Sequence, residues 1–316
     1  MPRVKLITTP LKDTNSTRGV GEYTRRLSSM IKYQDGEVDV VHYPFFDLFR
    51  HTLPILKNTK TVVTIHDVIP LEYPHIYRPG VKGWINLQLQ KLALMSVDRV
   101  ITDSYASVKA IKKYLGVPDS KINLVYLAAG EEFKPKKVSK KYNLPRKFVL
   151  YIGDVNWNKN IPGLISACKL IDMPLVIIGR QAKDLDKLDL NHPELNHLKD
   201  VDWSGVIRLG YVSEEEKIDV LNLASVYCQP SFAEGFGIPV LEAMACGVQV
   251  AVSKTHSLPE IASSEAEYFD PYNIEQMSQA IQKALANKFY VITQSKKFSW
   301  KNTVQMTLQV YKQICH

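Results

Sequence analysis

Short apolar runs alternate with amphipathic stretches along the first half of the chain. The β-branched runs at 38–42 and 61–65 have the length of strands and are bounded by turn or polar residues. Between residues 84 and 97 the apolar positions are dense and have roughly helical spacing. Strands that alternate with helices predict βαβ units and a parallel sheet. Further elements of this half are expected at 4–8, 21–32 and 99–102.

A second series of the same kind follows a stretch at 133–137 that we interpret as a linker. Residues 174–179 form a continuous apolar run that ends in glycine, which is typical of a fully buried parallel strand. Pro162 opens a helix in its first turn. The remaining elements are expected as strands at 148–152, 206–209, 226–229 and 248–252, and as helices at 162–171 and 300–315.

The composition is that of a globular protein of two domains: 316 residues, 45% hydrophobic and 23% charged. No apolar run reaches the roughly 18 residues of a membrane span, and the N-terminus passes directly into a predicted strand, so we expect a cytoplasmic protein without a signal peptide. The four cysteines have no zinc spacing, and we single out no group of acids that would hold a divalent ion between diphosphate oxygens. We therefore expect no metal and no other cofactor.

The charge is uneven along the chain. Residues 1–145 contain 23 Lys and Arg against 13 Asp and Glu, a balance of +10, whereas residues 146–316 contain 17 against 19, a balance of −2. A basic half predicts an anionic partner, such as nucleic acid, anionic lipid or a phosphorylated molecule. A solvated basic face explains the same balance about equally well.

The segment 231–247 is the most specific in the chain. Its glycines at 235 and 237 allow a tight turn with exposed backbone N–H groups, and a helix beginning near Pro239 directs its positive end at that turn, which predicts an anion site. Glu234 lies in the turn and Glu242 about two helical turns later. A carboxylate held there suits hydrogen bonds to vicinal sugar hydroxyls. Either glutamate alone reads as an ordinary surface acid, but the combination favours a binding site.

Glu234 and Glu242 form an E-x7-E motif within EGFGIPVLEAMACG, which resembles the signature of the family 4 retaining glycosyltransferases. Further matches lie along the chain, at 18–24 (RGVGEYT), 66–67 (HD), 159–160 (KN), 257–260 (SLPE) and 298–300 (FSW). The resemblance implies an α/β protein of the GT-B fold: two doubly wound Rossmann-like domains face a central cleft, and a C-terminal helix crosses back to the N-terminal domain. The implied divisions are an acceptor-side domain at 1–145, a donor nucleotide-binding domain at 146–297, and the returning helix at 298–316.

The resemblance also implies the reaction and its residues. A UDP- or GDP-linked sugar would be transferred to an acceptor hydroxyl with retained configuration and without metal. Lys159 would neutralise the leaving diphosphate, Glu234 would hold the donor sugar, and His66 would face the reacting carbon. These three are the implied catalytic positions. Donor contacts are implied at Gly19, Val20, Gly210, Val212, Gly235, Phe236, Gly237, Ile238 and Glu242.

One position departs from the family pattern. The family often has an arginine five residues before the lysine, and here that residue is Asp154. An acid beside a diphosphate is repulsive, so we expect Asp154 to point away. Arg18 and Arg180 are candidates for the second phosphate contact, although each reads equally well as a surface arginine.

The acceptor is indicated only by the basic first half. Lys and Arg residues close to apolar and aromatic side chains favour docking on an anionic bilayer, at the inner face of the membrane. We therefore expect a lipid-linked or cell-surface glycan as acceptor. The aromatic residues considered for this surface are Phe45, Phe46, Phe49, Tyr77 and Trp84.

Two other classes of protein remain as alternatives. Another sugar-nucleotide enzyme of the same architecture, such as an epimerase, would share two such domains but leaves the EGFG turn and Lys159 unexplained. A non-catalytic nucleic-acid or nucleotide binder would explain the basic half, but the sequence contains no helix-turn-helix, RNA-recognition or zinc-finger pattern. We therefore expect no nucleic-acid partner.

Overall fold

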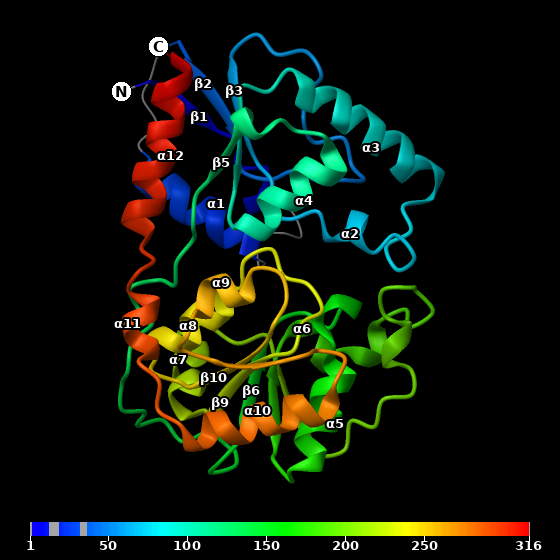
Figure 1. Cartoon of the computed structure of the whole chain (residues 1–316), viewed down its shortest axis with the longest axis vertical. Helices are drawn as coiled ribbons and strands as arrows, with labels where there is room; N and C mark the ends of the chain where they lie inside the picture. Colours follow the sequence, from blue (N-terminus) through cyan, green and yellow to red (C-terminus); the bar gives the residue numbers. More distant parts are fainter. Residues whose placement is uncertain (1, 13–18, 32–36, 316) are drawn as a thin grey trace. The chain divides into compact units, whose positions relative to one another are not determined.

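The computed structural model describes residues 2–12, 19–31 and 37–315, which form two compact units (Figure 1). The first unit contains Met1–Ala128 and Ser299–His316, and the second contains Ala129–Phe298. The division thus falls after residue 128 rather than after 145. The segment that follows Ala128 is tied to the second unit, because Lys136 Nζ lies 2.5 Å from Asp219 Oδ1 and the Tyr142 hydroxyl donates to Asp219 Oδ2 at 2.7 Å.

The first unit is built on a sheet of five parallel strands. They lie side by side in sequence order: β1 (Val4–Leu6), β2 (Val40–Tyr43), β3 (Lys60–Thr64), β4 (Arg99–Thr102) and β5 (Ile122–Leu124). This order differs from a doubly wound sheet, since the chain crosses from one edge to the other without reversing. Alternate residues of β3 enter two separate cores, Val62 on one face and Val63 on the other.

Helices cover both faces of this sheet. Val63 packs in a cluster with Leu94 and Ile111, whereas Val62 packs in a cluster with Val310 and Tyr311. The C-terminal helix therefore completes the core of the first unit (Figure 1, red). The helices are α1 (Gly19–Met30), α2 (Ile69–Glu72), α3 (Gly80–Met95), α4 (Tyr105–Leu115) and α12 (Trp300–Cys315), with 3-10 turns η1 (Thr9–Leu11) and η3 (Asp119–Lys121).

The second unit has six parallel strands in the order β11-β10-β9-β6-β7-β8. The order reverses between β6 and β9, which makes this sheet doubly wound, and ligands of such sheets bind beyond the carboxyl ends of the strands at the reversal. The strands are β6 (Val149–Ile152), β7 (Leu175–Ile178), β8 (Val206–Gly210), β9 (Val226–Gln229), β10 (Val250–Ser253) and β11 (Glu267–Phe269).

Two of the helices of this unit, α5 and α10, pack in one cluster with the sheet, with Ile161 and Met277 buried beside Val149. The helices are α5 (Ile161–Leu170), α6 (Arg180–Lys183), α7 (Glu214–Leu223), α8 (Ile238–Ala245), α9 (Leu258–Ala262), α10 (Ile274–Ala286) and α11 (Val291–Ser295), with 3-10 turns η4 (Trp157–Lys159), η5 (Leu185–Lys187) and η6 (Asn196–Leu198). In neither unit do the described residues form a helix with the length and apolar character needed to cross a bilayer.

Candidate functional site

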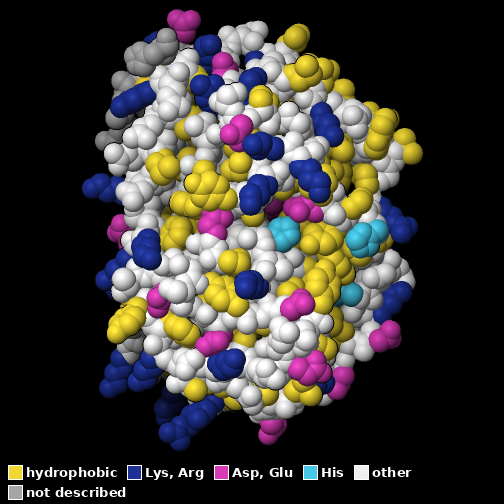
Figure 2. Space-filling model, viewed as in Figure 1, with side chains coloured by type: hydrophobic (Ala, Val, Ile, Leu, Met, Phe, Trp, Pro, Cys, Tyr) yellow, Lys and Arg dark blue, Asp and Glu magenta, His cyan; other side chains and the backbone are white. Residues whose placement is uncertain are grey.

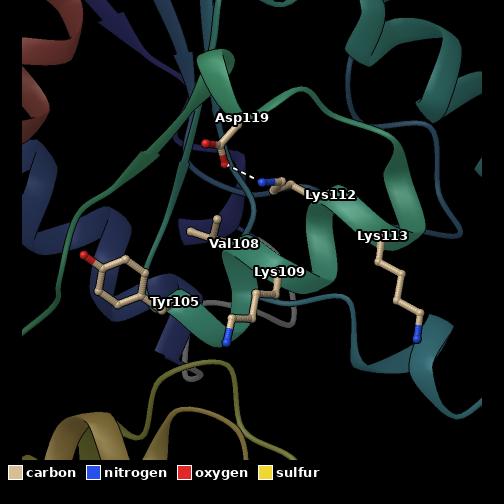
Figure 3. A pocket seen from close by; sticks show the side chains of 6 residues that line it. All are labelled: Tyr105, Val108, Lys109, Lys112, Lys113 and Asp119. Carbon is tan, nitrogen blue, oxygen red and sulfur yellow. Dashed lines mark hydrogen bonds and ion pairs between the residues drawn. The ribbon is translucent and has the colours of Figure 1, made fainter.

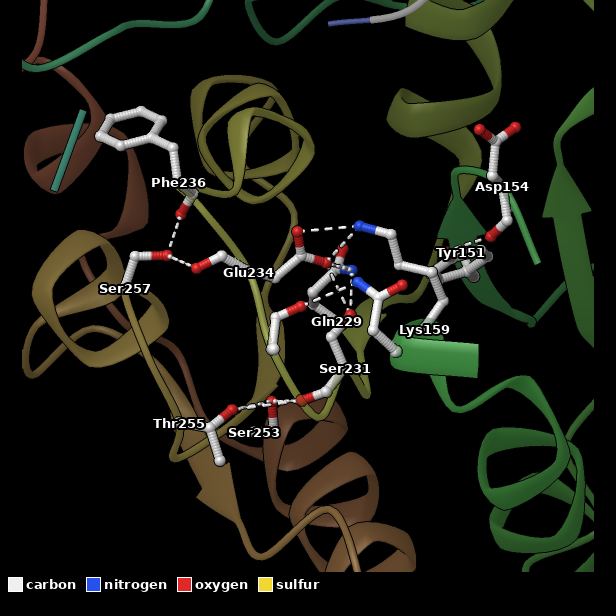
Figure 4. Close-up of polar contacts among 12 residues, drawn as sticks. Tyr151, Asp154, Lys159, Gln229, Ser231, Glu234, Phe236, Ser253, Thr255 and Ser257 are labelled. Carbon is white, nitrogen blue, oxygen red and sulfur yellow. Dashed lines mark hydrogen bonds and ion pairs between the residues drawn. The ribbon is translucent and has the colours of Figure 1, made fainter. Parts of the chain in front are cut away.

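An ion pair lies at the carboxyl edge of the second sheet, where the strand order reverses (Figure 4). Lys159 Nζ donates to both carboxylate oxygens of Glu234 at 2.8 Å. Two further donors approach Oε1 of the same carboxylate, the Gln229 amide at 2.7 Å and the Ser231 hydroxyl at 2.6 Å. The Glu234 side chain is only 10% exposed. Four hydrogen bonds therefore hold one nearly buried carboxylate in a single orientation.

The chain positions this pair through two loops that follow neighbouring strands. Lys159 closes the turn η4 after β6, and Glu234 follows β9. The two loops are tied together, since Asn158 Nδ2 donates to the Ala233 carbonyl at 3.0 Å and Phe232 N donates to the Asn158 carbonyl at 2.8 Å. The fold thus brings Lys159 and Glu234 into contact, although they are 75 positions apart in the sequence. Both were expected at the donor site.

The sequence interpretation did not include Gln229 and Ser231. The signal was available, because both are polar residues at the carboxyl end of a continuous buried strand, the edge at which ligands bind. Gln229 also accepts a short hydrogen bond from the Tyr227 hydroxyl. Burial raises the pKa of Tyr227 well above its usual value, and the nearby charges of Glu234 and Glu242 raise this pKa further.

The expected donor turn, residues 235–238, leads into the N-terminus of α8. Gly237 has φ +110°, a left-handed conformation that favours glycine, and precedes the first helical residue, Ile238. The Ser257 hydroxyl lies 3.0 Å from the Glu234 carbonyl oxygen and 2.7 Å from that of Phe236, which fixes the turn from α9. Two of the four turn residues are glycines, and the helix N-terminus favours an anion.

Glu242 lies within α8 and is 5% exposed. Its Oε1 accepts a hydrogen bond from Lys217 Nζ at 2.9 Å, and that ammonium lies 4.7 Å from the ring centre of Phe133. Among the described residues no hydrogen bond to Oε2 is formed. The two glutamates of the motif are therefore held by two different lysines.

The other expected phosphate and base contacts lie on neighbouring loops of the second unit. Arg180 is exposed at the start of α6 and stacks 5.6 Å from the ring centre of Tyr211, which lies between Gly210 and Val212. The Gly210 carbonyl accepts a hydrogen bond from Gly179 N at 3.0 Å. Figure 4 shows the Asp154 carboxylate pointing away from Lys159, as expected for an acid near an anion site.

In the first unit, His66 lies two residues after the carboxyl end of β3. It forms a dyad with Asp103, which follows β4. His66 Nδ1 lies 2.5 Å from Asp103 Oδ2, and His66 Nε2 lies 3.2 Å from the Pro44 carbonyl oxygen. Both partners are acceptors, which favours the doubly protonated ring. Burial lowers the pKa of His66, but the charge and hydrogen bond of Asp103 outweigh it, and the net pKa is raised.

The sequence interpretation singled out His66 but not Asp103, although Asp103 stands at a strand end just as His66 does. The other expected residues of this unit are Gly19 and Val20, which begin α1. A side chain at Gly19 would meet nothing within 4 Å. Arg18 lies outside the described residues.

The first unit also has a hollow of about 550 Å³ on α4 (Figure 3). Its one carboxylate, Asp119, already pairs with Lys112 at 2.8 Å. The lining of the hollow therefore contains more positive than negative charge. Its lining residues are Tyr105, Val108, Lys109, Lys112, Lys113 and Asp119.

Metal ligands do not gather anywhere in the described parts of either unit: no group of three or more His, Cys, Asp or Glu side chains could hold an ion. The charges that surround the Glu234 carboxylate come from Lys159 and from polar hydrogens. Independence from metal stays a prediction.

Comparisons with known proteins cover both units. A profile described as "Glycosyl transferases group 1" matches residues 131–304, and one described as "Glycosyltransferase Family 4" matches residues 3–129. O-antigen chain mannosyltransferase B of Escherichia coli is 30% identical over 274 residues, which are 80% of this chain and 70% of that protein. Serotype-specific mannosyltransferase WbdA of Escherichia coli is 28% identical over 278 residues, which are 81% of this chain. The chain spans only 34% of that relative's length.

The fold has relatives among solved structures. Sucrose-phosphate synthase from Thermosynechococcus elongatus aligns with a TM-score of 0.66 and 20% identity, over 98% of this chain and 82% of that one. With the two parallel sheets described above, this likeness confirms the expected GT-B fold. From the profile matches over both units and the 30% identical relative, the chain belongs to the family 4 glycosyltransferases.

Proposed function

We propose that the protein is a retaining glycosyltransferase that moves a hexose from a UDP- or GDP-linked donor to an acceptor hydroxyl. The observation that carries this proposal is the Lys159–Glu234 pair beside the glycine turn at the N-terminus of α8. A fixed carboxylate, an ammonium and the N-terminus of a helix in one place suit a sugar joined to a diphosphate. The family profiles that match both units favour a transferase over an epimerase-like or nucleic-acid-binding protein.

The donor takes over contacts that the side chains now make with each other. Lys159 neutralises the diphosphate as it leaves, while Gln229 and Ser231 keep the Glu234 carboxylate aimed at the hydroxyls of the sugar. Glu242 binds the ribose hydroxyls. The turn at 235–238 meets the diphosphate through backbone amides. Gly210, Val212 and Arg180 contribute to the base and phosphate contacts.

In the first unit, we assign His66 to the donor sugar and the start of α1, Gly19 and Val20, to the diphosphate. The bond from the anomeric carbon to the diphosphate breaks, and the bond to the acceptor oxygen forms on the same face of the sugar. The acceptor's proton passes to the departing phosphate oxygen. No protein nucleophile is needed, and charge stabilisation by Lys159, amides and the helix N-terminus replaces a metal.

The names of the relatives guide the choice of acceptor and sugar. Two Escherichia coli relatives are named as mannosyltransferases, one of them for an O-antigen chain. We propose a lipid-linked or cell-surface glycan as acceptor, with mannose as the first sugar to test. Such an acceptor agrees with a protein that binds the surface of an anionic membrane through its basic unit.

Donor binding is tested by thermal unfolding with UDP, GDP and their sugar conjugates. A ligand at about 100 times its dissociation constant adds roughly 2.7 kcal/mol to the free energy of unfolding if it binds only the folded state. We expect a shift with one nucleotide family. Glu242→Gln should abolish the shift, whereas Glu215→Gln, an exposed acid on α7, should keep it. No shift with any nucleotide would refute the donor site.

Chemistry is tested with the donor that binds. Transfer should persist in a chelator, and the product's anomeric proton, measured by NMR, should have the configuration of the donor. Glu234→Gln should lower turnover strongly, because the neutral amide weakens the hold on the sugar hydroxyls. Near-normal turnover of Glu234→Gln would contradict the role of this carboxylate, and an inverted product would contradict retention.

A further inference from the structure

Helix α3 is apolar on two opposite faces. Its inward face is buried in the first unit through Leu87, Ala93 and Leu94. Its outward face carries large apolar side chains that are exposed to solvent. Gln88 is the one polar residue among them. The exposed fractions are Val81 80%, Trp84 58%, Ile85 48%, Leu92 49% and Met95 74%.

These outward residues form one continuous stripe. With 3.6 residues per turn, all of them lie within about 60° on either side of Val81 around the helix axis. The buried residues of α3 lie on the opposite side. Folding of the first unit therefore explains the inner face of this helix and leaves the outer face, which we call the α3 stripe, without a structural role.

Positive charge flanks the α3 stripe on both sides. Lys82 and Lys91 project about 100° and about 80° from its centre in opposite directions, and the helix contains no Asp or Glu. Figure 2 shows hydrophobic side chains with Lys and Arg nearby along the edge where Figure 1 places α3. An apolar stripe with a lysine on each side is typical of helices that lie in the interface of an anionic membrane.

The C-terminal end of α3 extends the same surface. Lys57 Nζ donates to the Ala93 carbonyl at 2.6 Å, and Lys121 Nζ donates to the Met95 carbonyl at 3.0 Å. Two ammonium groups thus bind carbonyl oxygens at the C-terminal end of this helix. Leu56, which precedes one of these lysines, is 87% exposed.

The structure corrects the aromatic surface expected from the sequence. Phe46 and Tyr77 are buried, at 5% and 7% exposure, and Phe46 belongs to the core of the first unit. Phe45 and Phe49 are half-buried. Of the five aromatic residues considered, only Trp84 is largely exposed, and it belongs to the α3 stripe.

We propose that the α3 stripe and Leu56 dock the first unit on an anionic bilayer. The helix lies in the plane of the interface, with its apolar side chains at the boundary of the acyl chains and its lysines at the lipid phosphates. The inference deepens the proposed function and rests on it only for the choice of a lipid-linked acceptor. Membrane binding itself requires no sugar chemistry.

The test measures binding of the whole chain to vesicles by flotation at low salt. We expect binding to vesicles that contain phosphatidylglycerol and much weaker binding to pure phosphatidylcholine. Trp84 reports on the surface directly, because its fluorescence should shift to shorter wavelength when vesicles are added. Trp84→Phe should keep most of the binding and lose that shift.

A charge within the α3 stripe should weaken binding. Ile85→Glu should lower the vesicle partition coefficient about tenfold, since one side chain loses its burial in the interface and a like charge is added to an anionic surface. The matched control is Leu170→Glu, which places the same charge at a 60% exposed apolar residue of the second unit. The control should bind as the parent does, and both variants should unfold at the parent's temperature.

The absence of flotation with either vesicle would overturn the proposal, and so would an equal loss of binding in both variants. A third contrary result is a chain that binds no vesicles and forms a dimer that Ile85→Glu dissociates. That result would assign the α3 stripe to contact with a second copy of the chain. The nucleotide-induced thermal shift separates this inference from the proposed function. A chain that floats but shows no nucleotide shift refutes the transferase proposal and leaves the docking surface standing. A chain that shows the nucleotide shift but does not float refutes the docking surface and leaves the transferase proposal standing.

Discussion

In the first unit, two histidines have opposite pKa shifts because their neighbours differ. His42 meets the hydroxyls of Tyr311 and Thr64, at 2.6 and 2.8 Å. Burial, and then the charge of His66, lower the pKa of His42 to about 3. His66 meets the Asp103 carboxylate, and its pKa is raised in spite of its burial. The Asp103 carboxylate thus accounts for the opposite directions of the two pKa shifts.

Replacing Asp103 by Asn should reverse the pKa shift of His66. The amide keeps the shape but removes the negative charge, so desolvation dominates and the pKa of His66 should fall below its usual value near 6.5. The titration is followed by NMR of the imidazole resonances, with His66→Gln used for assignment. Asp119→Asn, at an exposed acid of the same unit, is the control and should leave the His66 titration in place.

The same substitution predicts a pH dependence of stability. A group whose pKa is raised by folding stabilises the folded chain below the unfolded-state pKa, and this contribution disappears as the pH rises through the folded-state value. The loss of unfolding free energy in Asp103→Asn should therefore be largest in mild acid, below about pH 6.5, and should shrink above it. A loss that is constant across the pH range would argue against a charged His66.

The Lys159–Glu234 pair should show strong coupling in a double-mutant cycle. Lys159→Met leaves a nearly buried carboxylate without its counter-ion and should lower the free energy of unfolding by about 2 to 3 kcal/mol. Glu234→Gln in the same chain should recover much of this, with a coupling energy of about 1 to 3 kcal/mol. Urea unfolding of the two single variants and the double variant measures it. Strictly additive effects would contradict the pairing.

At the scale of elements, the second unit depends on a close approach between two strand ends. A Cβ built at Gly179 would lie 2.1 Å from the Gly153 carbonyl oxygen, and backbone cannot yield as a flexible side chain does. Gly179 follows β7 and Gly153 follows β6, beside the candidate donor site. Only glycine fits there without moving a loop of that site.

Gly179→Ala should accordingly destabilise the second unit by about 2 kcal/mol or more, since overpacking commonly costs 1 to 3 kcal/mol. Chemical unfolding measures the loss. Gly19→Ala is the control: its added methyl meets nothing within 4 Å, and we expect a change within about 0.5 kcal/mol. Equal effects at both glycines would show that the close approach is not a constraint.

The sequence predicted elements best where burial is complete or the apolar period is long. The strands at 99–102 and 226–229 and the helix at 300–315 have the predicted bounds. The three-residue strands β5 and β11 were not singled out, because such short, half-buried strands contain too few positions to display a period.

The candidate site was predictable only in part. The motif residues are clustered in sequence, so Glu234, Glu242 and the glycine turn stand out by their spacing. The partners of the site residues are a different matter. Asp103 is 37 positions from His66, and Lys217 is 25 positions from Glu242. Such pairs are set by which strands and helices become neighbours, which a local pattern does not contain.

At the scale of the whole molecule, the first unit is formed by two separate parts of the chain. Helix α12 returns after the second unit and contributes Val310, Tyr311 and Ile314 to a core with β1, β2, β3 and β4. The Thr303 hydroxyl donates to the Tyr126 carbonyl at 2.6 Å, which ties the helix to the end of the first segment. The C-terminal residues are therefore core residues of the first unit.

Tyr311→Ala should destabilise the first unit selectively. The ring is fully buried, so its removal should cost about 3 to 5 kcal/mol. Calorimetry with a bound nucleotide should show one transition at lower temperature and the nucleotide-stabilised transition unchanged. Met306→Ala, at a 38% exposed position of the same helix, is the control. A uniform shift of both transitions would contradict the assignment of α12 to one unit.

The discontinuous first unit also has a consequence for synthesis on the ribosome. Its first 128 residues emerge long before α12, because the whole second unit, residues 129–298, is made in between. At a translation rate of 5 to 20 residues per second, the sheet face that Tyr311 covers in the folded protein stays exposed for roughly 10 to 30 s. During that interval the nascent chain exposes Val40, Val62 and Ile101. The second unit can finish folding first, although it is translated later, and the protein's yield in cells should depend on chaperones that shield that face until the last helix arrives.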